Sequence, residues 1–146
     1  MAEVRTEHVL PRPLAVAGAV TAPARLGSDI RRLLDLVWPV IREQKVRTGL
    51  NVVVYHGTPM TIEAGVEILG DFNETEFVRR SATPGGEAAA TTHWGDYSEM
   101  RPAYQALEVW SVSSGRAFAG VSWEVYGHWS DDPSQRRTDI FFLLKE

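Results

Sequence analysis

The 146-residue sequence contains no cysteine, so it has neither a disulfide framework nor a thiolate metal site. It also lacks an excess of positive charge, because 15 Lys and Arg stand against 19 Asp and Glu and give a net charge of −4. Without a broad cationic surface, we expect no direct nucleic-acid binding. The apolar run from Leu14 to Val20 is too short to span a bilayer, and no signal peptide is recognisable. We therefore expect a cytoplasmic protein without a membrane anchor.

Short motifs for metal, cofactor or nucleophilic chemistry are also missing. The histidines are widely spaced, at His8, His56, His93 and His128. They have no metal-ligand spacing, and Asp131-Asp132 lacks the rest of a calcium loop. No Gly-rich phosphate loop, nucleophile elbow or zinc-protease signature occurs. The sequence therefore predicts neither a metal nor a cofactor. Catalysis is not favoured, although a catalytic set assembled from distant residues would leave no motif.

The sequence does have the composition of a folded domain. Hydrophobic residues make up 44% and charged residues 23% of the chain, values that are typical of globular proteins. The length suits a single domain over residues 1–146 with one real core. The oligomeric state is left open by these observations.

Two series of elements follow one another in the same order. The first series, at about 13–80, reads as a strand to about residue 22, a helix over 28–48, and strands over 51–56 and 61–72. Pro39 lies inside this helix and predicts a kink. A linker-like segment at 81–86 divides the chain. The second series, at about 87–145, reads as a strand over 87–94, a helix over 98–113, and strands over 118–128 and 137–144. Each series is a strand-helix-strand-strand unit.

Residue matches between the two units indicate a duplication. The segment Val37–Val40 resembles Val109–Val112 at an offset of 72, and Tyr55–Gly57 resembles Tyr126–His128 at an offset of 71. Two elements thus give nearly one offset. Chance is the alternative explanation, because Val and aromatic residues are common in helices and strands. A duplicated domain has a natural groove where its halves meet, and ligand pockets favour such junctions.

Glu124 breaks the symmetry of the two units. Strand alternation places Glu124 and Tyr126 on one face, and the matching positions in the first unit are Val53 and Tyr55. A desolvated carboxylate is costly unless it is paired, and an organic cation stacked on an aromatic ring would offset that cost. The alternative is a solvated strand edge, where Glu124 pairs with Arg136 or Arg137.

The second unit resembles a known family. The residues that carry the resemblance are His93–Met100, Ala103-Tyr104, Leu107, Trp110, Trp123–Tyr126 and Thr138–Ile140. In these residues the chain is similar to the GyrI-like small-molecule-binding domains, which are also the effector-binding modules of multidrug-responsive transcription regulators. The resemblance extends over about 13–145, so we expect a stand-alone member with no room for a helix-turn-helix domain.

The resemblance implies an α+β fold with pseudo-twofold symmetry. Its duplicated units would form a mainly antiparallel sheet with two principal helices on one side and a central aromatic cleft. Such a cleft often holds a glutamate that recognises cationic drugs, and Glu124 is the matching position. The candidates for the wall are Tyr55, Tyr126 and Trp94, with Trp38 behind them and Phe141 near the closing strand. Each of these aromatics has a core position as its alternative.

Three functions compete at this stage. The first is a binder of small hydrophobic compounds, cationic aromatic ones included, that uses Glu124. The second resembles family members that hydrolyse strained cyclopropane-containing toxins, with Glu124 as general acid or base. The third is an interaction with a protein partner, as in the gyrase-inhibitor members of the family. The fold also resembles haem-associated SOUL domains, but no histidine stands in an axial-ligand motif, so we expect no haem.

Overall fold

The computed structural model describes residues 2–57 and 59–146. Its strands are β1 (Arg5–Val9), β2 (Pro13–Val20), β3 (Thr48–His56), β4 (Thr61–Ile68), β5 (Arg79–Ala82), β6 (Gly86–Trp94), β7 (Phe118–Tyr126) and β8 (Arg137–Leu144). Its helices are α1 (Leu26–Gln44) and α2 (Arg101–Ser114), with short 3-10 turns η1 (Pro23–Arg25), η2 (Tyr97–Glu99) and η3 (Pro133–Gln135). No helix in these two ranges is long and apolar enough to cross a membrane.

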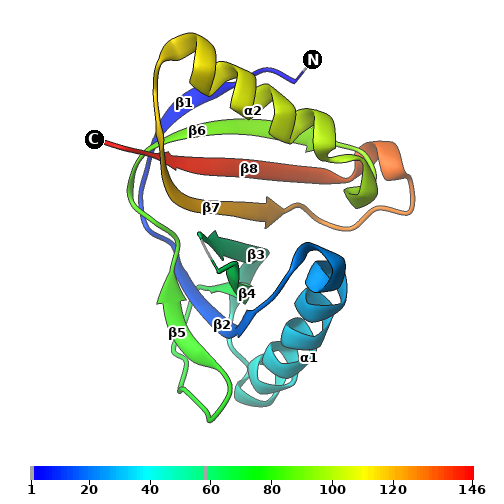
Figure 1. Cartoon of the computed structure of the whole chain (residues 1–146). Coiled ribbons are helices and arrows are strands. Elements are labelled where there is room, and N and C mark those ends of the chain that lie inside the picture. Colours follow the sequence, from blue (N-terminus) through cyan, green and yellow to red (C-terminus); the bar gives the residue numbers. More distant parts are fainter. Residues whose placement is uncertain (1, 58) are drawn as a thin grey trace.

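All eight strands form one antiparallel sheet in the order β1-β6-β8-β7-β3-β4-β2-β5. The strand order is symmetric about the boundary between β7 and β3, because β8 and β6 on one side correspond to β4 and β2 on the other. The edge strands β1 and β5 also correspond, although β1 precedes the first unit in the sequence and pairs with β6 of the second. In Figure 1 the second unit with α2 lies above the first unit with α1. The predicted α+β fold, with duplicated strand-helix-strand-strand units and pseudo-twofold symmetry, is thus confirmed. At the centre, Val53 pairs directly with Glu124, so these equivalent positions lie on the pseudo-twofold axis.

The two helices are equivalent at an offset of 70 residues. Both end in a left-handed C-cap, Lys45 with φ 54° and Gly115 with φ 72°. The buried residues Leu33 and Val37 of α1 then correspond to Ala103 and Leu107 of α2. The predicted match of the two helices at an offset of 72, which aligned Trp38 with Trp110, is therefore wrong. Large aromatics produced that alignment, whereas the caps and the buried face fix the true one.

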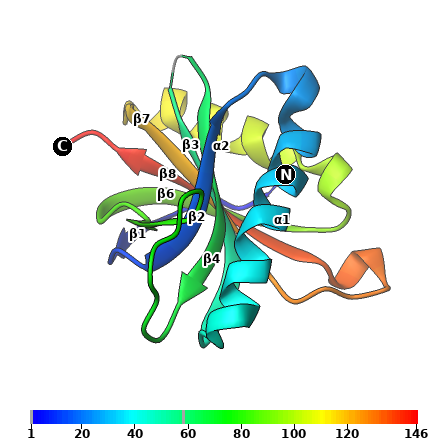
Figure 2. The ribbon, with the colours of Figure 1, turned by 90° about the horizontal axis from the view of Figure 1, so that it is seen from below.

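The sheet buries both of its faces. One face packs against the helices through Leu33 and Val37 of α1 and Leu107 of α2. The other face closes on itself, because the twist brings β2 and β6 into one cluster with Trp123 and Phe141, whose rings stack at 5.2 Å. Figure 2 shows β2 crossing close to β1 and β6 in the view from below. The helices can therefore leave space between them without exposing the core.

Several element boundaries differ from the predicted ones. Helix α1 ends at Gln44, earlier than predicted, because Lys45 adopts the left-handed conformation. Pro39 lies inside α1 at an exposed position, and the helix continues beyond it to Gln44. Helix α2 begins at Arg101, because Asp96 caps the preceding 3-10 turn by accepting a bond from the Ser98 amide. The edge strand β1 was not predicted at all.

Candidate functional site

A cavity of about 900 Å³ lies between α1 and α2 on the helix-covered face of the sheet. Its floor comes from the two central strands, β3 and β7, where Asn51 and Tyr55 lie beside the equivalent residues Ser122 and Tyr126. Glu124 is the remaining floor residue and lies on the pseudo-twofold axis. The two units thus build one cavity at their junction, which is the position expected from the duplication.

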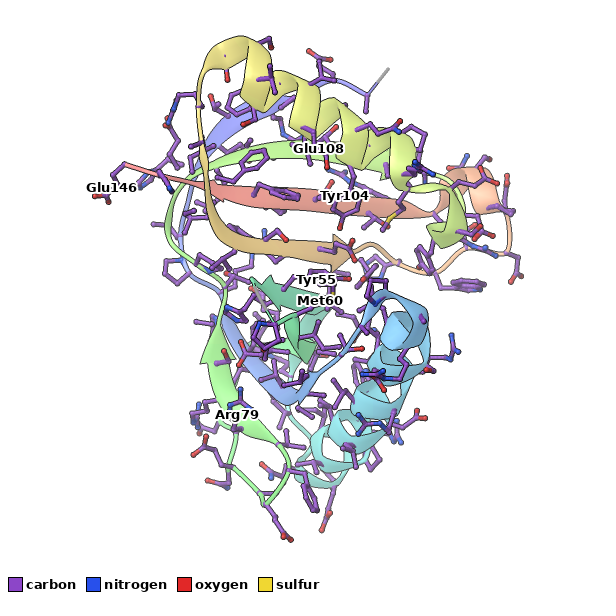
Figure 3. All side chains as sticks on the ribbon, viewed as in Figure 1. Tyr55, Met60, Arg79, Tyr104, Glu108 and Glu146 are labelled. Atoms are coloured by element: carbon purple, nitrogen blue, oxygen red, sulfur yellow. The ribbon has the colours of Figure 1, made fainter. Side chains whose placement is uncertain are left out.

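The two sides of the cavity differ in chemistry. The α1 side is mainly aliphatic and presents Leu26, Ile30, Leu34 and Met60. The α2 side is mainly aromatic and presents Tyr97, Tyr104 and Trp129. Figure 3 labels Tyr55 and Met60 between the two halves of the molecule and Tyr104 beneath α2. An apolar ligand would therefore be held between an aliphatic wall and an aromatic wall.

Three of the four tyrosines in the sequence donate hydrogen bonds to the Glu124 carboxylate. Tyr55 Oη lies 2.8 Å from Oε1, Tyr126 Oη also donates to Oε1, and Tyr104 Oη donates to Oε2. Only 3% of Glu124 is exposed. The three hydroxyls come from β3, α2 and β7, so the carboxylate ties both units and a helix together.

The buried carboxylate has neutral partners only. Within residues 2–57 and 59–146, no Arg, Lys or His nitrogen lies within 4.0 Å of Glu124. The alternative of a solvated edge that pairs with Arg136 or Arg137 is therefore wrong. Arg136 contacts Asp96 at 3.3 Å, and Arg137 contacts Asp139 at 3.1 Å. Hydroxyl donors compensate part of the desolvation of an anion, but they supply no positive charge.

The tyrosines around Glu124 are held in the protonated form. Burial, reinforced by the negative charge of Glu124, raises the pKa of Tyr55, Tyr104 and Tyr126 well above the ordinary tyrosine value. A protonated hydroxyl is a permanent donor, so the carboxylate oxygens keep fixed directions. The site can therefore present an oriented negative charge to the cavity. In the described part of the chain, no group of three or more His, Asp or Glu is arranged to hold a metal ion.

The structure brings together only some of the residues proposed for the wall. Tyr55 and Tyr126 line the cavity beside Glu124. Trp38 does not line it, but packs against the core cluster beside α1 and donates its indole N–H to Asn51 Oδ1 at 3.1 Å. Trp94 is 57% exposed and faces Arg137 outside the cavity. Phe141 lies on the opposite face of the sheet, stacked on Trp123. The prediction of Trp38, Trp94 and Phe141 as ligand-contacting residues is therefore corrected, because none of the three lines this cavity.

Tyr104, Tyr97 and Trp129 were missed as cavity residues. Tyr104 has helical spacing with the apolar residues Met100 and Leu107, which is the pattern of a helix face that packs on a sheet, but its hydroxyl reaches Glu124. The helix offset of 70 aligns Tyr104 with the apolar Leu34. Like Glu124, Tyr104 is therefore a polar residue at a position where the other unit has an apolar one. Tyr97 and Trp129 come from segments that flank α2 and β8, and their rings lie 6.3 Å apart at the mouth. Only the tertiary arrangement brings these two segments together.

The comparisons with known proteins give structural relatives only. The sequence matches no protein-family model and no curated protein. The C-terminal domain of EcmrR has a TM-score of 0.80 at 19% identity, over 100% of this chain and 99% of that domain. EcmrR in its complex with DNA has a TM-score of 0.84 at 15% identity, over 99% of this chain. This chain spans 58% of the EcmrR chain in that complex.

Two further structures have the same fold. SAV2435 bound to tetraphenylphosphonium has a TM-score of 0.73 at 9% identity, over 98% of this chain and 94% of that protein. A hydrolase from Listeria innocua has a TM-score of 0.66 at 9% identity, over 98% of this chain and 92% of that protein. Identities this low show a shared fold alone.

Proposed function

We propose that this chain, whose fold is that of the GyrI-like small-molecule-binding domains, binds a hydrophobic organic cation in the cavity between its two units. One observation carries the proposal: the Glu124 carboxylate is buried at the cavity floor and is held by three neutral hydroxyls, and none of the described residues gives it a cationic partner. A bound cation would supply the missing positive charge in a place where water screens it weakly.

The walls support a bulky, partly aromatic ligand. A volume of about 900 Å³ lies in the range of cavities that hold drug-sized molecules, roughly 300–1,000 Å³. The Tyr97 ring offers a π-surface to a cation, while Ile30 and Leu34 offer apolar surface on the opposite side. Trp129 adds aromatic surface, and the Arg136 guanidinium already stacks on its ring, 3.7 Å from the centroid. SAV2435, which shares this fold, binds tetraphenylphosphonium, so we take that compound as the first probe.

The proposal predicts selectivity for positive charge at constant shape. Tetraphenylphosphonium and tetraphenylborate have nearly the same size and surface but opposite charge. We expect the phosphonium to bind at least about tenfold more tightly, because only the cation is attracted by Glu124. Isothermal titration calorimetry with both ions in the same buffer measures the difference. Equal affinities would contradict the selectivity for cations and leave a binder of hydrophobic compounds, whereas no binding of either ion would contradict the proposal and favour the interaction with a protein partner.

A second candidate function is hydrolysis of a strained electrophile, since hydroxyl groups and a carboxylate converge on the cavity and a Listeria innocua hydrolase has this fold. Catalysis would require Glu124 or a tyrosine to move a proton at neutral pH. The raised pKa of the three tyrosines makes them weak acids, and this favours binding over turnover. Incubation with a cyclopropane-containing electrophile, followed by mass spectrometry for the water adduct, separates the two functions.

A further inference from the structure

Two arginines flank the mouth of the cavity at equivalent positions of the two units. Arg31 lies in the second turn of α1, and Arg101 is the first residue of α2. Their spacing is the offset of 70 that relates the helices, so each unit contributes one guanidinium from the same place. Both side chains line the cavity, and both residues are exposed. The guanidinium of Arg31 lies near Gly27, which also lines the cavity.

These two arginines differ from their neighbours in having no acidic partner among the described residues. Arg25 and Arg32 flank Asp29 at 4.0 and 3.5 Å, and Arg136 contacts Asp96. Neither Arg31 nor Arg101 forms an ion pair within residues 2–57 and 59–146. The cavity thus has one buried negative group at its floor and, at its mouth, two arginines without an ion pair among the described residues. A third guanidinium, that of Arg136, stacks on Trp129 at 3.7 Å, but it is already paired with Asp96.

A simple cation does not use this arrangement fully. It is attracted by Glu124 at the floor, but it passes two guanidinium groups and gains nothing from them. Guanidinium groups bind carboxylate, sulfonate and phosphate oxygens with directed N–H donors. A ligand with a cationic apolar body and an acidic group at its outer end would satisfy both ends of the cavity.

We propose that the ligand class of this cavity is amphoteric: a bulky aromatic cation that also carries a carboxylate, sulfonate or phosphate, with the acidic group held by Arg31 and Arg101. The inference rests on the proposed function, because it takes the cation to lie beside Glu124. It adds that the mouth selects for a negative group, a property that Glu124 and the aromatic wall do not provide.

Rhodamine B and its methyl ester form a matched pair of probes. The acid carries a carboxylate beside a delocalised cation, and the ester keeps the cation but loses the carboxylate. The quantity to measure is the ratio of the two dissociation constants, by fluorescence anisotropy. We expect the ratio of the ester's dissociation constant to that of the acid to be about tenfold larger in the wild type than in the Arg31→Gln, Arg101→Gln double variant. Both arginines are replaced together, because each exposed contact alone is weak. High salt should reduce this difference between the two proteins, since exposed charges are screened.

The controls separate this inference from the proposed function. The double variant Arg32→Gln, Arg42→Gln removes two charges from α1 outside the cavity lining and should leave the ratio unchanged. In one outcome Glu124→Gln weakens binding of the ester, but the Arg31 and Arg101 substitutions do not alter the ratio. This outcome would overturn the amphoteric ligand class and leave the proposed function intact. Failure of both dyes to bind the wild type would overturn both.

Discussion

Replacing Glu124 with glutamine is expected to weaken tetraphenylphosphonium binding by about a hundredfold. Glutamine keeps the size of the side chain and an oxygen acceptor for the tyrosine hydroxyls, but it carries no charge. Two opposite charges about 4–5 Å apart attract by roughly 3–4 kcal/mol at the effective dielectric of a partly screened site, whereas a hundredfold change corresponds to about 2.7 kcal/mol. Because Glu124 is only 3% exposed, little water is available to screen the lost attraction. Isothermal titration calorimetry on the two proteins measures the effect.

Glu108→Gln provides a matched control for this experiment. Glu108 lies on the exposed side of α2, away from the cavity lining, and is labelled in Figure 3. Its replacement changes the net charge by the same amount, so it reports the long-range effect of one negative charge. A neutral probe, triphenylphosphine oxide, should bind all three proteins alike. Equal losses of phosphonium affinity in the two variants would show that Glu124 has no local role.

The asymmetry at Glu124 was predictable from the sequence because it depends on short-range pattern only. Strand alternation and the tyrosine match set Glu124 against Val53, and the structure pairs these two residues on the axis. The partners of Glu124 were harder to predict. Tyr104 has helical spacing with apolar neighbours, which is also the pattern of a core residue, and only the crossing of α2 over β7 aims its hydroxyl at the carboxylate.

Phe141 and Trp94 were misplaced because alternation divides a strand into two faces without saying which face holds the cavity. In β8, Phe141 pairs with Trp123, and both side chains enter the self-closed face of the sheet. A shift of register by one residue would have reversed the assignment. The register of β8 depends on its pairing with β6 and β7, which the sequence of β8 alone does not encode.

The edge strands illustrate the same limit. Strand β1 is short and polar, so its local sequence pattern gives only a weak indication of a strand. Hydrogen bonds to residues far away in the sequence hold it in place. Arg5 bonds Thr92, which in turn donates to Asp139 at 2.7 Å. At the opposite edge Arg79 of β5 bonds Glu63 at 2.6 Å. Each edge strand therefore contributes an arginine toward a carboxylate further into the sheet, an arrangement that requires the assembled sheet.

The tyrosines around Glu124 predict a steep loss of stability at alkaline pH. Burial and the Glu124 charge raise the pKa of Tyr55, Tyr104 and Tyr126 in the folded protein, whereas an unfolded tyrosine titrates at about 10. Below that pH both states keep these protons, and the tyrosines add no pH dependence. Above it the unfolded chain releases protons that the folded protein retains, so the free energy of unfolding falls as the pH rises. The slope approaches about 1.4 kcal/mol per pH unit for each tyrosine, or about 4 kcal/mol for the three.

Urea unfolding at pH about 9, 10 and 11 measures this slope, because tyrosine ionisation begins within that interval. The chain has only two lysines, so few other groups contribute in the same range. Tyr55→Phe removes one of the three groups whose pKa is raised, so it should reduce the slope by about one third. The lost hydrogen bond also lowers stability at neutral pH, but this does not affect the slope. Tyr97→Phe, which removes a tyrosine that does not bond Glu124, should leave the slope of the wild type. Two results would show that the three tyrosines do not act as a buried, protonated set around the carboxylate. One is a wild-type slope of no more than about 1.4 kcal/mol per pH unit, the value for a single proton. The other is an equal slope in the two variants.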